Sequence, residues 1–290
     1  MSSLEDLVKD QLPDEPELSF SRSDIEKRIS FPAGRFTSPG PLLAPLVALL
    51  AAAVFYGVMA IFPGRGWSDM FTQRGPVPYV IVYFSCWASM LLIIKDRKLA
   101  LQRKALDMRL IPPDDPSFSL TPKTAKKVLE TVYGYVDDPN HFLLTRRIHY
   151  ALSNLQNMGR IGDVDEVLRT QSENDEAQVD SSYTVLAGFI WAIPVLGFIG
   201  TVLGLSLALG SFGDVLNSAS EMEQLRSALQ EVTGGLSTAF ETTLQGLVAT
   251  LCIHMFMISV KRKEEAFLDD CKDYCQKYIV GRLRLVEPRA

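Results

Sequence analysis

The sequence predicts an all-α polytopic membrane protein with four transmembrane helices. Its mean hydropathy is slightly positive, at +0.11, although 22% of its residues are charged. The charges are segregated, because three long runs hold no Asp, Glu, Lys or Arg and a fourth holds one. These runs are 41–63, 76–94, 181–213 and 232–260. Apolar runs of about 20 residues are long enough to cross a bilayer core as helices. We therefore expect transmembrane helices at 41–63, 76–95, 181–213 and 232–260.

The remaining segments are expected to face water. Residues 1–40 mix proline, serine and charge. This composition predicts a cytoplasmic N-terminal segment that is partly disordered or forms a membrane-surface helix around Ile25–Phe31. Residues 96–180 predict a small cytoplasmic helical domain, with one helix starting at Thr121-Pro122 and ending at Asp138-Pro139. The long third and fourth helices are expected to extend into this domain, and 261–290 to form a cytoplasmic C-terminal helix.

Basic residues gather on one side of the expected spans. They precede the first span (Arg22, Lys27, Arg28, Arg35), follow the second (Lys95, Arg97, Lys98, Arg103, Lys104) and follow the fourth (Lys261, Arg262, Lys263). The short connections carry only Arg65, Arg74 and Arg226. The positive-inside rule then places both termini in the cytoplasm. No basic, early apolar signal peptide precedes the first span, which agrees with a cytoplasmic N-terminus.

Several functional classes are disfavoured by composition and motifs. The net charge of −5 offers no basic surplus for nucleic acid. Neither His-Glu-x-x-His nor Gly-x-Ser-x-Gly occurs, so an intramembrane enzyme is not expected. The four cysteines lack zinc-site spacing, and Cys271 and Cys275 are expected to pack in a helix. We expect no metal, no catalytic residue and no cofactor.

The third expected span carries small residues on one face. Gly197, Gly200 and Gly204 recur at helical spacing, and Pro194 removes a backbone donor inside the span. Small residues allow helix backbones to approach closely in lipid. This pattern is typical either of a tight packing face with a kink or of a pore or hinge wall, and both interpretations remain open.

The fourth expected span contains the isolated Glu241. Polar and small residues share its side of the helix, at about 100° per residue. These are Thr238, Thr242, Gln245, Ala249 and Cys252. A carboxylate inside a span costs roughly 3 kcal/mol, so it usually faces a wet cavity or a polar partner. Hydroxyls at Thr201, Thr238, Thr242 and Thr243 favour ion or proton handling; the alternative is a protonated Glu241 that hydrogen-bonds between helices.

Two strings in these spans resemble the MotA/TolQ/ExbB family of bacterial ion-channel subunits. In the third span, Pro194-Val195-Leu196-Gly197-Phe198-Ile199-Gly200-Thr201-Val202-Leu203-Gly204 resembles the family's Leu-Gly-x-x-Gly-Thr-Val-x-Gly signature. In the fourth, Gly235-Leu236-Ser237-Thr238-Ala239-Phe240-Glu241-Thr242-Thr243-Leu244-Gln245-Gly246-Leu247 resembles the second signature, with its threonine and its final Gly-Leu. The resemblance covers about residues 181–262.

The resemblance implies a homopentameric ring around two copies of a MotB/TolR/ExbD-like single-span partner in the bacterial inner membrane. The partner's acidic transmembrane residue would carry H⁺ or Na⁺, and no other cofactor is implied. Thr201 and Thr243 match the family's pore-facing threonines, and Pro194 matches its third-span proline. ExbB-type chains carry a glutamate in the fourth-span motif, and the resemblance places it at position 238. This chain departs from that pattern, since it has Thr238 there and Glu241 three residues later. The rival interpretation is a non-conducting helical membrane scaffold or sensor.

Overall fold

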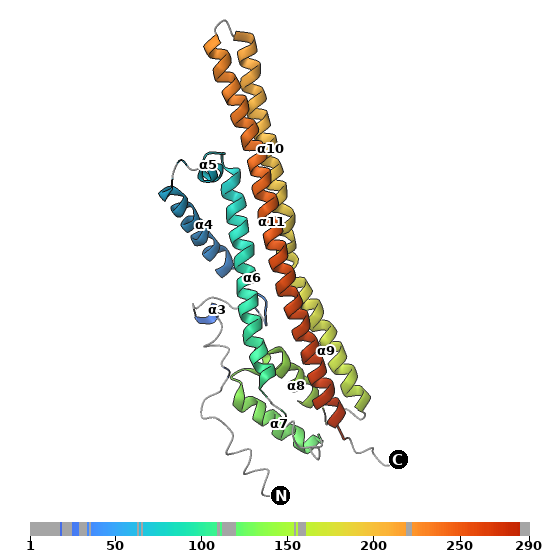
Figure 1. The fold of residues 1–290 in the computed structure, drawn as a ribbon. Helices are drawn as coiled ribbons and strands as arrows, with labels where there is room; N and C mark the ends of the chain where they lie inside the picture. Colours follow the sequence, from blue (N-terminus) through green and yellow to red (C-terminus); the bar gives the residue numbers. More distant parts are fainter. Residues whose placement is uncertain are drawn as a thin grey trace. The chain divides into compact units, whose positions relative to one another are not determined.

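The computed structural model describes residues 18, 25–28, 34, 36–62, 64, 66–108, 111, 120–153, 155, 161–218 and 222–284. Helices account for all regular secondary structure in these residues, apart from the isolated bridges Leu18–Val136 and Leu120–Leu283 (Figure 1). They are α3 (Ile25–Arg28), α4 (Leu43–Ile61), α5 (Gly66–Thr72), α6 (Val77–Asp107), α7 (Pro122–Tyr135), η1 (Pro139–His141), α8 (Leu143–Ser153), α9 (Ile161–Ser182), α10 (Thr184–Ser218), α11 (Met222–Tyr278) and η2 (Val280–Arg282). The predicted all-α class is confirmed.

Four helical segments are long and apolar enough to cross a membrane. They are Leu43–Ile61, Val77–Asp107, Ile161–Gly210 and Leu229–Arg282. These segments follow the chain order of the four apolar runs in the sequence, so the number of candidate membrane helices is the expected one. The third and fourth segments are much longer than the roughly 20 residues that a bilayer core requires.

The described residues divide into two compact units. The apolar unit comprises 43–93 and 183–259, and the polar unit comprises the described parts of 1–42, 94–182 and 260–290. Helices α6 and α11 each contribute residues to both units. Of the flanking basic residues named above, Arg22, Arg35 and Arg65 lie outside the described part of the chain, as do residues 29–31 of the expected surface helix.

Local capping explains the boundaries of the short helices in the polar unit. The Thr121 hydroxyl accepts a hydrogen bond from the N–H of Thr124, and the Thr124 hydroxyl bonds back, which forms a capping box. Pro122 follows at the first helical position, where its missing N–H costs nothing. Asp138 then caps η1 through the N–H of Asn140. The predicted start at Thr121-Pro122 matches the start of α7, whereas α7 ends at Tyr135, three residues before Asp138.

Buried ion pairs connect separate segments of the polar unit. Lys95 and Glu264 are each about 1% exposed, with the Lys95 Nζ to Glu264 Oε2 distance at 2.8 Å. Lys98 pairs with Glu26 of α3, which also accepts hydrogen bonds from the backbone of Gly34 and Gly40. Lys95 and Lys98 thus serve the interior of this unit, in addition to any role as flanking positive charges. The pairing offsets the large cost of burying each charge alone.

The apolar unit consists of two helical hairpins. Helices α4 and α6 are joined through α5, while α10 and α11 lie side by side and continue beyond the α5 end of the first hairpin (Figure 1). Aromatic rings connect the two hairpins, because Phe189 of α10 lies 5.0 Å from Trp87 and 5.3 Å from Phe84 of α6 between ring centroids. This unit contains every residue that the sequence assigns to the candidate site.

Candidate functional site

Small residues bring α10 and α11 into backbone contact along what we call the α10–α11 seam. A Cβ atom at Gly204 would lie 2.7 Å from the carbonyl oxygen of Gly235 and 2.9 Å from the backbone nitrogen of Ala239. A Cβ at Gly246 would lie 3.0 Å from the carbonyl oxygen of Ile193. Only glycine fits such approaches, since real Cβ contacts are wider. The seam comprises Gly197, Gly200 and Gly204 on α10 and Gly235, Ala239, Thr242 and Gly246 on α11.

Three hydroxyls lie on this seam. Thr201 of α10 and Thr243 of α11 are hydrogen-bonded to each other, and both side chains are half-buried. The Thr201 hydroxyl also lies 3.0 Å from the carbonyl oxygen of Ala239, and the Thr243 hydroxyl 3.2 Å from that of Gly197. Thr242 is fully buried against Gly200. The fold therefore joins residues that the sequence places 42 positions apart.

Glu241 has a polar partner that lies outside the seam. The Arg74 guanidinium donates to both carboxylate oxygens, with distances of 2.6 Å from Nε and 3.1 Å from Nη2. The Ser237 hydroxyl, one turn earlier on α11, donates to the same carboxylate at 2.7 Å. The side chains of Arg74 and Glu241 are about one quarter exposed. The carboxylate is thus held by a bidentate, charge-assisted contact of the strong type.

The polar side chains that the sequence places on one face of α11 contact two different elements, α10 and α5. Thr242 faces α10, whereas Gln245 donates from Nε2 to the carbonyl oxygen of Met70 in α5 at 2.7 Å. Glu241 and Gln245, which are four residues apart, therefore contact α5 and the connection after it. Thr238 donates to the carbonyl oxygen of Gly234 in its own helix. These four polar residues of α11 therefore do not form one cluster.

Arg74 is the partner of Glu241 that the sequence did not single out. It is one of three arginines in the short connections, and by sequence it counts only as a loop charge. A signal was present, because an acid inside a span requires compensation. The nearest basic residues along the chain lie 15 and 20 positions away, at Arg226 and Lys261, so a distant partner such as Arg74 was to be expected.

Pro194 lies within α10, and the helix continues through it.

The outward faces of α10 and α11 carry large apolar side chains that the described residues leave uncovered. Trp191 and Leu207 are each 72% exposed and Phe240 is 67% exposed. Such surfaces in membrane helices contact lipid or other transmembrane helices.

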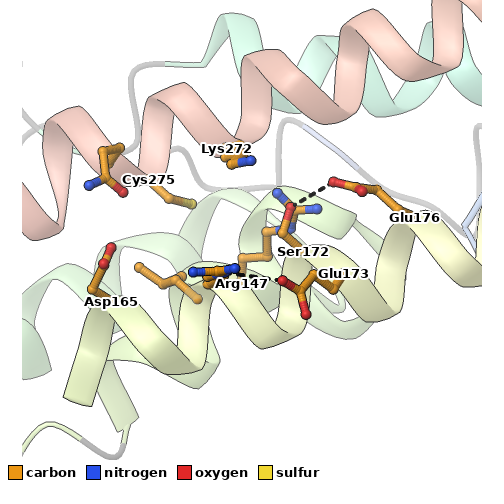
Figure 2. A pocket seen from close by; sticks show the side chains of 10 residues that line it. Arg147, Asp165, Ser172, Glu173, Glu176, Lys272 and Cys275 are labelled. Carbon is orange, nitrogen blue, oxygen red and sulfur yellow. Dashed lines mark hydrogen bonds and ion pairs between the residues drawn. The ribbon is translucent and has the colours of Figure 1, made fainter. Parts of the chain in front are cut away.

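The polar unit contains a cavity of about 480 Å³ between α9 and α11 (Figure 2). Its lining is Arg147, Asp165, Leu168, Arg169, Ser172, Glu173, Glu176, Lys272, Cys275 and Gln276. The lining carries three cationic and three anionic side chains, so their formal charges balance. Arg169 pairs with Glu173 across one helical turn. The Arg147 Nε donates to Asp175 at 2.7 Å. This balance gives no preference for a ligand of either sign.

The thiols of Cys271 and Cys275 in α11 are packing residues. Cys271 is fully buried and Cys275 is 3% exposed, and burial raises the pKa of the Cys275 thiol to about 12. Among the described residues, no group of three His, Cys, Asp or Glu side chains is placed to hold a metal ion.

Comparisons with known proteins agree with the motifs on the seam. The model of the MotA/TolQ/ExbB proton channel family matches residues 140–272, a range that includes α10, most of α11 and the whole seam. No curated protein and no solved structure matches the chain. The family resemblance predicted from the two span motifs is thus confirmed: residues 140–272 of this chain match the model of the MotA/TolQ/ExbB proton channel family.

Proposed function

We propose that this chain is the ion-conducting subunit of a MotA/TolQ/ExbB-type motor complex, which converts an H⁺ or Na⁺ motive force into mechanical motion. The observation that carries the proposal is the hydroxyl pair of Thr201 and Thr243. Both lie in membrane-spanning helices, inside the family match, and they contact each other across the seam.

In the proposed mechanism, five copies of the chain surround two copies of a MotB/TolR/ExbD-like single-span protein. The ion passes between the ring and the partner's acidic residue in the bacterial inner membrane. The threonine hydroxyls supply oxygen atoms to the ion, and either can also donate a hydrogen bond. A potential of 100 mV gives about 2.3 kcal/mol per charge, which is enough to shift a packing equilibrium between two helix arrangements.

The other predicted polar residues receive supporting roles. Thr242 is fully buried in the seam, where its hydroxyl lies 2.9 Å from the carbonyl oxygen of Thr238. Glu241 is neutralised by Arg74. We therefore propose that Thr238, Thr242 and Glu241 maintain the polar surroundings of the path, while Thr201 and Thr243 face the ion. Pro194 and the glycines Gly197, Gly200, Gly204 and Gly246 maintain the close helix packing that positions this pair.

The test is ion flux into vesicles that contain the chain with its partner. Thr201→Val and Thr243→Val keep the side-chain shape and remove the hydroxyl. Each should lower flux about tenfold or more without loss of assembly, because a hydrogen bond to a charged group is worth about 1.5–3 kcal/mol. Thr233→Val is the matched control, since the Thr233 hydroxyl is exposed and bonds carbonyl oxygens of its own helix. Wild-type flux in both variants would refute the assignment.

The alternative is a helical scaffold or sensor that conducts no ion. The glycine seam by itself is compatible with that function, because close packing requires no ion. Vesicle flux separates the two, since a scaffold gives no flux above that of protein-free vesicles at any membrane potential.

We propose a multi-pass inner-membrane location with both termini cytoplasmic, on the distribution of basic residues in the sequence.

A further inference from the structure

Three polar side chains lie along one face of α11, beside the seam. Successive residues of an α-helix are about 100° apart, so Thr250 and His254 each lie within about 20° of Thr243 around the helix axis. All three residues are half-buried. Glu241 lies about 160° from Thr243 and is not on this face. We call Thr243, Thr250 and His254 the polar line; the seam borders it on one side, and uncovered apolar residues such as Phe240 border it on the other.

His254 is the titratable side chain of the polar line. Between Thr243 and Val260, α11 contains no Asp, Glu, Lys or Arg. The other titratable residue of this stretch is Cys252, which lies about 160° from His254 around the axis. Thr243 and Val260 are about 25 Å apart along the helix, and His254 lies about 16 Å from Thr243. A proton that follows this face from the threonine pair therefore reaches His254 before the apolar run ends.

The helices beside this part of α11 contribute no Asp, Glu, Lys, Arg or His. A Cβ atom at Gly246 would lie 3.0 Å from the carbonyl oxygen of Ile193, and α10 and α11 are antiparallel. His254 is therefore level with about residue 185 of α10, and residues 185–190 are all apolar or glycine. Helix α6 contacts α10 near this level through the rings of Phe84 and Trp87. The titratable residues of α6 within the apolar unit are Tyr79, Tyr83 and Cys86.

Thr250 has a hydroxyl group that its own helix does not use. Threonines in helices often donate to a carbonyl oxygen one turn earlier, as Thr233 and Thr238 of α11 do. The Thr250 Oγ1 atom is buried and has no hydrogen-bond partner among the described residues. Cβ atoms four residues apart on a helix are separated by about 5–6 Å, so the imidazole of His254 is a neighbouring polar group. A hydrogen bond to that ring, or to a water that carries a proton along the line, would satisfy the hydroxyl.

We propose that His254 is a proton-binding group of the ion path and that the conducted ion is H⁺. This inference rests on the proposed channel function and deepens it. Histidine changes its charge between about pH 5 and 8. The neutral ring accepts H⁺ on its unprotonated nitrogen and later returns H⁺ to water, so only N–H bonds of the ring form and break. Hard cations such as Na⁺ prefer oxygen ligands, whereas imidazole suits softer metals, so His254 favours H⁺ over Na⁺.

The experiment measures H⁺ flux into vesicles that contain the chain with its single-span partner, at a fixed membrane potential and from about pH 5 to 8. In the wild type, we expect the flux to rise as the pH falls and to level off where histidine becomes charged. His254→Gln keeps a polar side chain that does not bind H⁺ in this range. It should lower the flux about tenfold or more and abolish the levelling. Met255→Gln is the matched control, because Met255 is the next residue of α11 and is 60% exposed.

Na⁺ flux gives a second measurement that requires no variant. With a Na⁺ gradient and equal pH on both sides, wild-type vesicles should take up no more Na⁺ than protein-free vesicles. Na⁺ uptake by the wild type, or an unchanged H⁺ flux and pH profile in His254→Gln, would overturn this inference and leave the channel function standing. Absence of flux of both ions in the wild type would refute the channel function, and this inference with it.

Discussion

Arg74 and Glu241 illustrate how one residue pair changes the interpretation of an in-span charge. By sequence, Glu241 is the single charge in a 29-residue run and therefore a candidate ion carrier. In the structure, the carboxylate is bonded by Arg74 and Ser237 at the α5 end of the hairpin. A charge that is paired in this way stabilises helix packing by fixing the connection after α5 against α11. The pairing depends on residues 167 positions apart, which no local pattern reveals.

A double-mutant cycle tests this role for Glu241. Glu241→Gln leaves Arg74 without its carboxylate, and Arg74→Gln leaves the acid without its base, so each should destabilise the protein by about 1–3 kcal/mol. The double variant Arg74→Gln/Glu241→Gln removes both charges. Its loss of unfolding free energy should be smaller than the sum of the losses in the two single variants. Thermal unfolding of the purified protein in detergent measures these differences.

Ion flux of the same variants gives a second, independent outcome. A structural ion pair predicts that the double variant recovers most of the flux that the single variants lose. Loss of flux in every variant without Glu241, including the double one, would instead identify Glu241 as an ion carrier.

At the scale of helices, the α10–α11 seam determines where the threonines lie. Glycines at 197, 200 and 204 let α11 approach until its backbone touches α10. Close approach then places the Thr201 and Thr243 hydroxyls within hydrogen-bond range. The small-residue spacing predicts such a face in the sequence. It does not predict which helix packs there, because Gly-rich faces can pair with any neighbouring helix.

Gly204→Ala tests the seam. The added methyl group would lie 2.7 Å from a backbone oxygen, and backbone cannot rotate away, so we expect destabilisation of about 1–3 kcal/mol and reduced ion flux. Gly188→Ala on the same helix is the control, because nothing lies within 4 Å of its added Cβ. Unfolding temperatures of the two variants, measured side by side, should fall for Gly204→Ala alone. Equal temperatures would contradict the seam as described.

For the molecule as a whole, the described residues leave large apolar surfaces uncovered on α10 and α11. The polar unit, by contrast, is held together by buried ion pairs, of which Arg147–Asp175 and Lys95–Glu264 have both side chains about 1% exposed. This contrast is typical of a membrane protein whose apolar helices contact lipid or further helices. It accords with the proposed ring of five copies and a central pair of partner helices.

Stoichiometry tests the whole-molecule proposal. Purified together with a MotB/TolR/ExbD-like single-span protein, the chain should form a complex of five copies with two copies of that protein. Native mass spectrometry gives the ratio directly. A stable monomer, or a ring that admits no acidic single-span helix, would exclude the proposed motor complex.

The sequence by itself predicts the number and order of the candidate membrane helices and the family resemblance, because hydropathy and motif spacing are local properties of the chain. It also identifies the glycine face and the threonines. Only the tertiary structure decides that Glu241 and Gln245 face α5 and the connection after it while Thr242 faces α10. These features depend on how each helix is rotated about its axis, and that rotation is set by packing between segments distant in the sequence.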